Sequence, residues 1–220
     1  MGIDSEDFIK GLKAALNDDS IVKALKEVIC KPLLTEMEQL KENIRQKDEL
    51  ILQLETKIEL LELKQDDQEQ YSRRNSLRIY GLQESDGENL MESLPNLLSK
   101  ETGLDPPMQK EEICRVHRVG RKVPEKRPRP IILKFATYQA RERLFKKRLF
   151  LKKSSALQSV FINEDLTKRR SRLLYDARML KKGSKITDVW TKDGKIFIKS
   201  LNGKIVQIQN ENQLGDIVKK

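Results

Sequence analysis

The pattern of apolar residues changes twice along this chain of 220 residues. Residues 4–31 carry short amphipathic stripes, the first beginning at Phe8, and these predict one or two short helices. Ser20 is the expected N-cap of the second helix. From Leu33 onward the apolar residues follow a strict four–three alternation, and no Gly or Pro interrupts residues 33–71. This periodicity predicts a long coiled coil.

The heptad repeat covers residues 32–70 and leaves two oligomeric states open. Ile at the a positions and Leu at the d positions favours a parallel dimer. Lys47 occupies a d position and is a polar intrusion in the seam. The segment from Lys57 to Glu62 resembles a trimer-favouring motif, with Lys at g and Glu at e. The side chains expected to mediate self-association are Leu40, Ile44, Ile51, Leu54, Ile58 and Leu61.

After the coiled coil the pattern becomes that of an α+β domain over residues 71–164. The expected elements are strand 77–82, helix 88–100, strand 113–119, strand 131–135, helix 138–150 and strand 160–162. This order, β-α-β-β-α-β, is typical of the ferredoxin-like fold and of the RNA-recognition motif. The first and third strands are mostly aliphatic or Arg, with Tyr80 as the one aromatic residue near the centre of the first strand. Any RNA binding is therefore expected to depend on guanidinium groups more than on stacked aromatic rings.

Two of these elements carry specific expectations about side-chain direction. Alternation along the second strand places Ile113, Arg115 and His117 on one face. Helix 138–150 is expected to turn its apolar residues inward, with Leu149 among them. Residues 120–130 are basic and interrupted by proline, and they predict a loop.

Residues 165–220 predict a second, smaller domain that completes an α+β chain. Asp165 or Thr167 is the expected N-cap of a helix that runs through Met179. Asp-Gly at 193–194 and Asn-Gly at 202–203 predict hairpin turns. The other expected elements are strands 186–190, 195–200 and 204–208 and a terminal helix over 211–218.

Charge is distributed very unevenly between the two parts of the chain. Residues 1–70 carry 10 Lys and Arg against 17 Asp and Glu, whereas residues 71–220 carry 34 against 17. Within residues 113–185 there are 23 basic residues and only 5 acidic ones. A basic surface of this strength attracts polyanions. Nucleic acid is the first candidate partner and an acidic membrane surface is the second.

The sequence offers little for catalysis or metal binding. Its two cysteines, Cys30 and Cys114, are far apart and fit a reducing compartment, and His117 is the only histidine. It contains no Gly-rich phosphate loop, HExxH motif or nucleophile elbow. We therefore expect no enzyme activity, no catalytic residues, no metal and no cofactor. No apolar run approaches the 18 residues of a membrane span, so no membrane insertion is expected.

Four segments together resemble a known family. They read SRRNSLRIYGL, RVHRVG, RPRPIILKF and LTKRRSRLL, and with the coiled coil they extend the likeness over about residues 33–215. The chain resembles the first-open-reading-frame proteins of LINE-type retrotransposons, or a host-captured derivative of one. The resemblance implies a coiled coil, an RNA-recognition-like domain and a small C-terminal domain.

The same resemblance implies a function and a set of contact residues. It implies a homotrimer that binds single-stranded RNA and DNA with little sequence preference and acts as a nucleic-acid chaperone. Such proteins coat their own transcript in a ribonucleoprotein particle and support reverse transcription by a separate reverse transcriptase. The particle is expected in the cytoplasm, with the nucleus as a second location. The residues that match the family's contact positions are Arg74, Asn75, Arg78, Arg115, Arg118, Arg127, Arg129, Arg169 and Arg170.

A second reading from another class remains open at this point. The chain could be a coiled-coil scaffold whose basic domain binds an acidic protein or an anionic membrane. Preference for polyacidic protein over RNA of equal charge would distinguish this adaptor from a nucleic-acid-binding protein.

Overall fold

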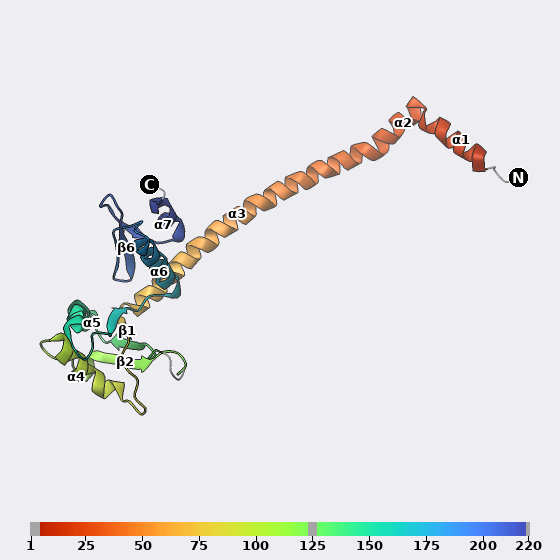
Figure 1. Cartoon of the computed structure of the whole chain (residues 1–220). Helices are drawn as coiled ribbons and strands as arrows, with labels where there is room; N and C mark the ends of the chain where they lie inside the picture. The colour runs from red at the N-terminus through yellow and green to blue at the C-terminus, as the bar shows by residue number, and fades with distance from the viewer. Residues whose placement is uncertain (1–4, 123–126, 219–220) are drawn as a thin grey trace. The chain divides into compact units, whose positions relative to one another are not determined.

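The computed structural model describes residues 5–122 and 127–218, and the chain divides into two units (Figure 1). The first unit is residues 1–62 and the second is residues 63–220. Residues 123–126, in the predicted basic loop, lie outside the described residues. The class is α+β: helices dominate the first unit, and the second combines helices with antiparallel strands.

The N-terminal helices are α1 (Ser5–Leu16), α2 (Asp19–Leu25) and a short π-helix (Lys26–Cys30). The prediction that Ser20 caps the second helix was wrong. The N-cap is Asp18, whose carboxylate accepts a hydrogen bond from the Ser20 amide at 2.8 Å. Ser and Asp are both favourable N-cap residues, and here the helix begins after Asp18, two residues before Ser20.

The long helix α3 (Lys31–Arg73) contains 43 residues and continues into the second unit. Pro32 is the second residue of α3 and directly follows the π-helix and its cap residue Lys31, so the chain is already helical here and Pro32 cannot donate a backbone hydrogen bond to the preceding turn. The predicted seam side chains are about half exposed in the single chain, as for Leu54 and Ile58. Apolar side chains in this state favour association with another helix, but a single chain does not show which one.

A four-stranded antiparallel sheet forms the first half of the second unit. Its strands lie in the order β2-β3-β1-β4. The chain order of the elements is β1 (Ser76–Tyr80), α4 (Leu90–Thr102), β2 (Ile113–Arg118), β3 (Ile131–Phe135), α5 (Tyr138–Lys147) and β4 (Phe161–Glu164), with 3-10 turns at Lys110–Glu112 and Arg148–Lys153. The strands are short because turn signals end them; β1, for example, stops before Gly81, whose φ is +84°.

One face of this sheet is buried under α4 and α5. Leu77 and Ile79 of β1 are fully buried and belong to one apolar cluster with Leu98 of α4 and Leu144 of α5. Because side chains alternate along a strand, the residues between them point to the opposite face. That opposite face, which we call the open sheet face, is where Tyr80 projects, and it is available to a ligand.

The prediction that Ile113, Arg115 and His117 lie on one face of β2 was partly wrong. The pairing of β2 with β3 shifts between Ile113 and Arg115, which marks a β-bulge. Ile113 is consequently buried, whereas Arg115 and His117 are exposed. The extra residue reverses the alternation, so Ile113 does not share a face with the two polar residues.

The prediction that Leu149 points inward was also wrong. The α-helix ends at Lys147, and a 3-10 turn follows over Arg148–Lys153. Leu149 is 58% exposed and Leu151 is fully buried. The tighter turn changes which positions face the core, because it has three residues per turn instead of 3.6.

The second half of this unit is a three-stranded antiparallel sheet with two helices. Its elements are α6 (Lys168–Lys182), β5 (Asp188–Lys192), β6 (Lys195–Lys199), β7 (Ile205–Ile208) and α7 (Glu211–Val218). Thr167 is the N-cap of α6, and its side chain accepts a hydrogen bond from the Arg170 amide at 3.2 Å. The turn at Asp193 and Gly194 has φ values of +53° and +72°, which confirms the predicted two-residue hairpin.

The end of α3 is joined to the start of α6 by buried polar contacts within the second unit. Gln70 is 5% exposed. Its amide nitrogen donates to the Asp165 carbonyl at 3.0 Å, and its amide oxygen accepts from the Thr167 backbone amide at 3.0 Å. Asp66 accepts from the side chains of both Thr167 and Arg170. These contacts fix the segment that links the two sheets.

Candidate nucleic-acid interface

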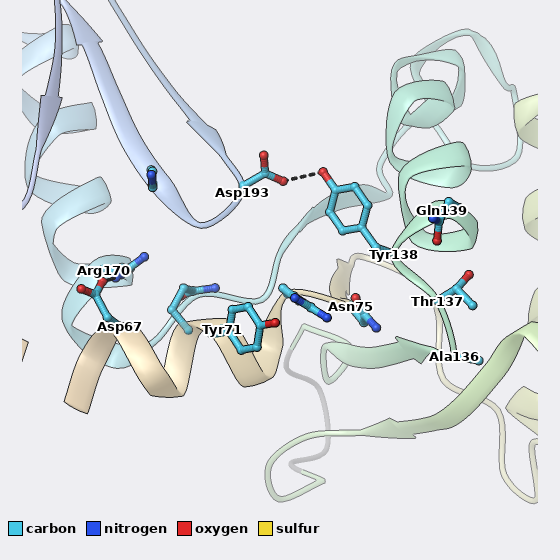
Figure 2. A pocket seen from close by; sticks show the side chains of 12 residues that line it. Asp67, Tyr71, Asn75, Ala136, Thr137, Tyr138, Gln139, Arg170 and Asp193 are labelled. Atoms are coloured by element: carbon cyan, nitrogen blue, oxygen red, sulfur yellow. Dashed lines mark hydrogen bonds and ion pairs between the residues drawn. The ribbon is translucent and has the colours of Figure 1, made fainter. Parts of the chain in front are cut away.

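A cleft of about 650 Å³ lies in the second unit at the end of α3 (Figure 2). Three further segments contribute to it: the turn between β3 and α5, the start of α6, and the β5–β6 hairpin. Its lining residues are Asp67, Gln70, Tyr71, Arg74, Asn75, Ala136, Thr137, Tyr138, Gln139, Arg170, Asp193 and Lys195. Asn75 comes directly before β1 and Ala136 directly after β3, so the cleft borders one end of the four-stranded sheet.

Asn75 lines this cleft and carries a buried acceptor without a partner. Its backbone carbonyl accepts a hydrogen bond from the Phe135 amide at 2.9 Å, which holds the residue against β3. Its side-chain Oδ1 is buried and has no hydrogen-bond partner among the described residues. A buried acceptor without a donor is costly, so a rotation of the Asn75 side chain that let this oxygen meet an N–H or O–H group would be favourable.

Basic and aromatic groups meet at the same cleft. The guanidinium of Arg74 lies over the Tyr71 ring at 4.1 Å from its centroid, and both side chains are exposed. Lys195 adds a second exposed cation. An exposed cation next to a ring can hold a phosphate while a base stacks nearby.

Tyr138 and Asp193 connect the two sheets at this cleft. Figure 2 shows the Tyr138 ring of α5 pointing toward Asp193 of the β5–β6 turn. The phenol donates to the Asp193 carboxylate at 2.6 Å, and this hydrogen bond, with burial, raises the pKa of Tyr138 to about 12. The phenol therefore stays protonated and can maintain this contact at neutral pH.

Arg170 lines the cleft but is largely committed to other contacts. Its Nε donates to Asp66 at 2.7 Å and its Nη1 donates to the Gly194 carbonyl at 3.1 Å. It also pairs with Asp67. With a side chain only 16% exposed, Arg170 primarily fastens α6 to α3.

Arg78 lies on the open sheet face and is paired with a buried carboxylate. Its Nη2 lies 2.7 Å from Asp165 Oδ1, while Arg73 reaches the other oxygen at 3.1 Å. Burial lowers the pKa of Arg78, but the interactions with Asp165 and with Tyr80 together leave the pKa raised. About a quarter of the Arg78 side chain stays exposed, so one edge can still meet a ligand.

Arg118 is a structural residue in this fold. Its side chain is 4% exposed and uses all five N–H donors. They bond to Glu88, at 2.6 and 2.9 Å, and to the carbonyls of Leu82, Gln83 and Arg129. The guanidinium also lowers the pKa of Glu88 through this hydrogen bonding. We do not retain Arg118 as a nucleic-acid contact.

Arg129 supports the same region from the other side of the basic loop. Its guanidinium pairs with Glu84, at 3.1 Å through Nε, and its Nη1 donates to the Gly120 carbonyl at 3.2 Å. These hydrogen bonds lower the pKa of Glu84. The acidic segment after β1 thus braces both ends of the basic loop.

The remaining predicted contacts are not brought together in one place. Arg115 and Arg127 are exposed and Arg169 is half-buried. These three residues have no ion pair within the described parts of the chain, so their charges are available to an external anion. Of the nine predicted residues, Arg74, Asn75 and Arg170 line the cleft, and Arg78 and Arg115 lie on the open sheet face.

An aromatic pair on the open sheet face was missed from the sequence. Tyr80 of β1 is paired with Phe161 of β4, and the rings are 39% and 52% exposed. Residues directly opposite each other in antiparallel strands project from the same face. Lys134, Arg115 and His117 are also exposed from β3 and β2. Phe161 lies between the apolar residues Val160 and Ile162, which are buried, and this alternation was the sequence signal that places Phe161 on the opposite face.

Other kinds of site receive no support from the described residues. In residues 5–122 and 127–218, no group of three or more His, Cys, Asp or Glu side chains is placed to hold a metal ion. The described helices include none that combines the length and apolar character needed to span a bilayer. Cys30 and Cys114 are both exposed and unpaired.

Comparison with known proteins does not identify the chain. No protein-family model matches it, and no curated protein matches it. The case for its function therefore rests on its own residues, their geometry and their charge.

Proposed function

We propose that this chain is a non-enzymatic, self-associating protein that binds single-stranded RNA and DNA and acts as a nucleic-acid chaperone. The observation that carries the proposal is the cleft in which exposed Arg74 stacks on Tyr71 beside the unpaired Oδ1 of Asn75. Phosphate-binding, base-stacking and hydrogen-bonding groups thus lie within one concave site. That combination suits a nucleotide strand better than a purely anionic protein.

A single strand would use these groups in different ways. Arg74 and Lys195 would neutralise phosphates, and Tyr71 would stack against a base. The Asn75 oxygen would accept a hydrogen bond from a base amino group or from a ribose 2′-hydroxyl. Phosphate contacts carry no sequence information, which supports sequence-tolerant binding.

The open sheet face would extend the same interface. The strand order β2-β3-β1-β4, with α4 and α5 covering one face, supports an RNA-recognition-motif-like fold. Such folds bind bases on the uncovered face of the sheet. Here the Tyr80–Phe161 pair would supply stacking and Arg115 and Lys134 would supply charge.

Self-association would come from α3. Its Leu and Ile side chains at heptad positions are about half exposed in the single chain, and packing them against a second or third copy would remove apolar surface from water. A parallel coiled coil, with a trimer favoured over a dimer, is our proposal. Several linked copies of a weak site raise the overall affinity through effective concentration.

In this proposal the chain is a first-open-reading-frame protein of a LINE-type retrotransposon or a captured derivative of one. Its assemblies would coat a transcript in a cytoplasmic ribonucleoprotein particle, with the nucleus as a second location, and would act beside a separate reverse transcriptase. Four sequence segments and the order of the elements support this placement.

Salt-dependent binding tests the proposal directly. We expect the affinity for a single-stranded RNA oligonucleotide to fall steeply with salt, because bound counterions are released. Arg74→Ala should make the negative slope of log K against log salt less steep by about 0.7, the value for one lost phosphate contact on a single strand. Arg45→Ala removes the same charge from the N-terminal unit and should leave the slope unchanged.

Two outcomes would contradict the proposal. A flat salt response of the full chain would remove the phosphate contacts on which it depends. Tighter binding of polyglutamate than of RNA with equal charge would instead support the adaptor reading.

A further inference from the structure

A second basic surface lies on the helical side of the four-stranded sheet, away from the open sheet face. It forms where the 3-10 turn after α5 packs beside the end of α4. Both helices pack against the face of the sheet opposite the open sheet face. A hollow of about 250 Å³ marks it. Its lining residues are Lys100, Glu101, Thr102, Gly103, Lys147, Phe150, Lys153 and Ser154.

The central feature of this surface is an exposed aromatic ring with two ammonium groups close to it. Phe150 is 47% exposed. The Nζ of Lys147 lies 5.1 Å from its ring centroid and the Nζ of Lys153 lies 5.6 Å away. Leu151, the next residue, is fully buried and anchors the turn that presents the ring. The exposed position of Phe150 is therefore held by the packing of its neighbour.

The hollow is lined by three lysines and one carboxylate, that of Glu101, so its net charge is positive. Within the described residues, Lys100, Lys147 and Lys153 make no ion pair, and the carboxylate of Glu101 accepts a hydrogen bond from Ser154. Arg148, by contrast, is a structural cation. Its guanidinium lies over the Phe145 ring at 3.8 Å and donates to the Phe145 carbonyl at 2.7 Å.

We propose that Lys100, Lys147, Phe150 and Lys153, together called the Phe150 patch, form a second binding site for a single-stranded nucleic-acid segment. The inference rests on the proposed function and names a further site for the same ligand class. A base would stack on Phe150, and the lysines close to the ring would neutralise its flanking phosphates. Gly103 has no side chain and the space beside its Cα is open, so the strand backbone can approach.

The composition of the patch favours a nucleic acid over an acidic peptide. An acidic peptide would use the ammonium groups but has no repeating planar group to cover the exposed ring. A single strand provides both a planar base and a phosphate in every nucleotide. The Phe150 patch offers one aromatic surface with two cations close to it, which matches that repeat.

Two separate sites on one chain would explain how strands are brought together. The cleft and the open sheet face would hold one segment, and the Phe150 patch would hold another on the helical side. Contacts dominated by lysine are strongly weakened by salt and exchange easily. The segment bound at the Phe150 patch could therefore base-pair with the segment in the cleft and then leave the patch, while the protein stays bound to the first strand.

The test uses the full-length protein and labelled single-stranded DNA oligonucleotides at low salt. We expect wild type to show a tight and a weak binding phase, with two strands bound per chain at saturation. The triple variant Phe150→Ala, Lys147→Gln and Lys153→Gln should retain the tight phase and lose the weak one. Its rate of annealing two complementary strands should fall by about tenfold, the scale of one lost stacking contact.

A matched variant controls for the loss of charge and apolar surface elsewhere. Leu201→Ala, Lys182→Gln and Lys185→Gln alter exposed side chains in the C-terminal part and should leave both phases intact. Thermal melting should be unchanged in both triple variants, because the substituted side chains are exposed or half-exposed.

The possible results separate this inference from the proposed function. If the patch variant anneals strands at the wild-type rate and still binds two strands, the Phe150 patch is not a nucleic-acid site. If it loses binding to polyglutamate but not to the oligonucleotide, its ligand is an acidic protein and the inference is overturned. If the wild-type protein shows no tight binding phase, the proposed function is overturned as well.

Discussion

At the scale of single residues, the basic side chains fall into two groups that the sequence does not distinguish. Arg118 has all five N–H donors bonded within the fold, whereas Arg74 is exposed and stacked on one ring. A guanidinium satisfied by the protein has no donor left for a phosphate. Structure therefore decides which arginines hold the fold together and which can hold a ligand.

This difference predicts opposite effects of two alanine substitutions. Arg118→Ala leaves Glu88 and several backbone carbonyls without their donor, and the free energy of unfolding should fall by about 3 kcal/mol. Arg74→Ala removes an exposed side chain and should change it by less than about 0.5 kcal/mol. Chemical denaturation monitored by circular dichroism would measure both values. Equal stability of the two variants would show that the Arg118 contacts contribute nothing to folding.

The limits of prediction at this scale follow from distance along the chain. Arg78 and Asp165 are 87 residues apart, and Arg118 and Glu88 are 30 apart, so no local pattern connects them. Asn75 and Arg74 were recognised as candidates through a resemblance, and they do line the cleft. Phe161 was not predicted because the stacking residues of RNA-recognition motifs are expected on the first and third strands, whereas Phe161 lies on the fourth strand, opposite Tyr80.

At the scale of elements, local signals predicted helices and turns well and irregular pieces poorly. Helix 211–218 and strand 131–135 were predicted with the bounds observed, and the Asp193–Gly194 turn has the expected backbone. The β-bulge in β2 and the 3-10 turn after α5 were not predicted. Both depend on how the strand or helix packs against its neighbours, and residue spacing alone does not encode that packing.

The link between α3 and α6 gives a prediction about Gln70. Gln70→Ala would remove the partners of two buried backbone groups, at Asp165 and Thr167, and would leave space beside Gly194. We expect a loss of about 2–4 kcal/mol in the free energy of unfolding, together with faster proteolysis between residues 164 and 168. Limited proteolysis and denaturation would measure these effects.

The matched control for this prediction is on the same helix. Gln53→Ala changes the same residue type at an exposed position of α3 outside the predicted seam and should leave both measurements unchanged. If Gln70→Ala behaves like Gln53→Ala, the buried amide does not hold the segment between the sheets.

At the scale of the whole molecule, self-association is expected along one face of α3. The apolar seam of α3 is exposed in one chain, and the heptad pattern that predicts its partners comes from the sequence alone. The four-stranded sheet, its covering helices and the basic character of the second unit were also anticipated from the sequence. What the sequence did not reveal was the cleft, because it is assembled from four segments of the second unit.

Self-association can be tested with two leucines close together on α3. Leu54→Asp places a charge at a predicted d position and should weaken self-association by at least about tenfold, because the charge would be buried in the seam. Leu52→Asp places the same charge at a more exposed apolar residue outside the seam and should have little effect. Sedimentation velocity over a range of concentrations would compare them. Equal self-association of both variants would contradict the coiled-coil proposal.

The contacts of Gln70 and Asp66 have a consequence for subunit equivalence. In the heptad register these residues occupy outward f and b positions, while Gln65 and Gln68, which continue the seam, are exposed. One side of α3 therefore holds the segment that leads into α6, and another side of α3 is left free for neighbouring copies of the chain. Whether two or three chains assemble, each would carry an identical strand-holding cleft, and the number of such clefts would rise in step with the number of chains.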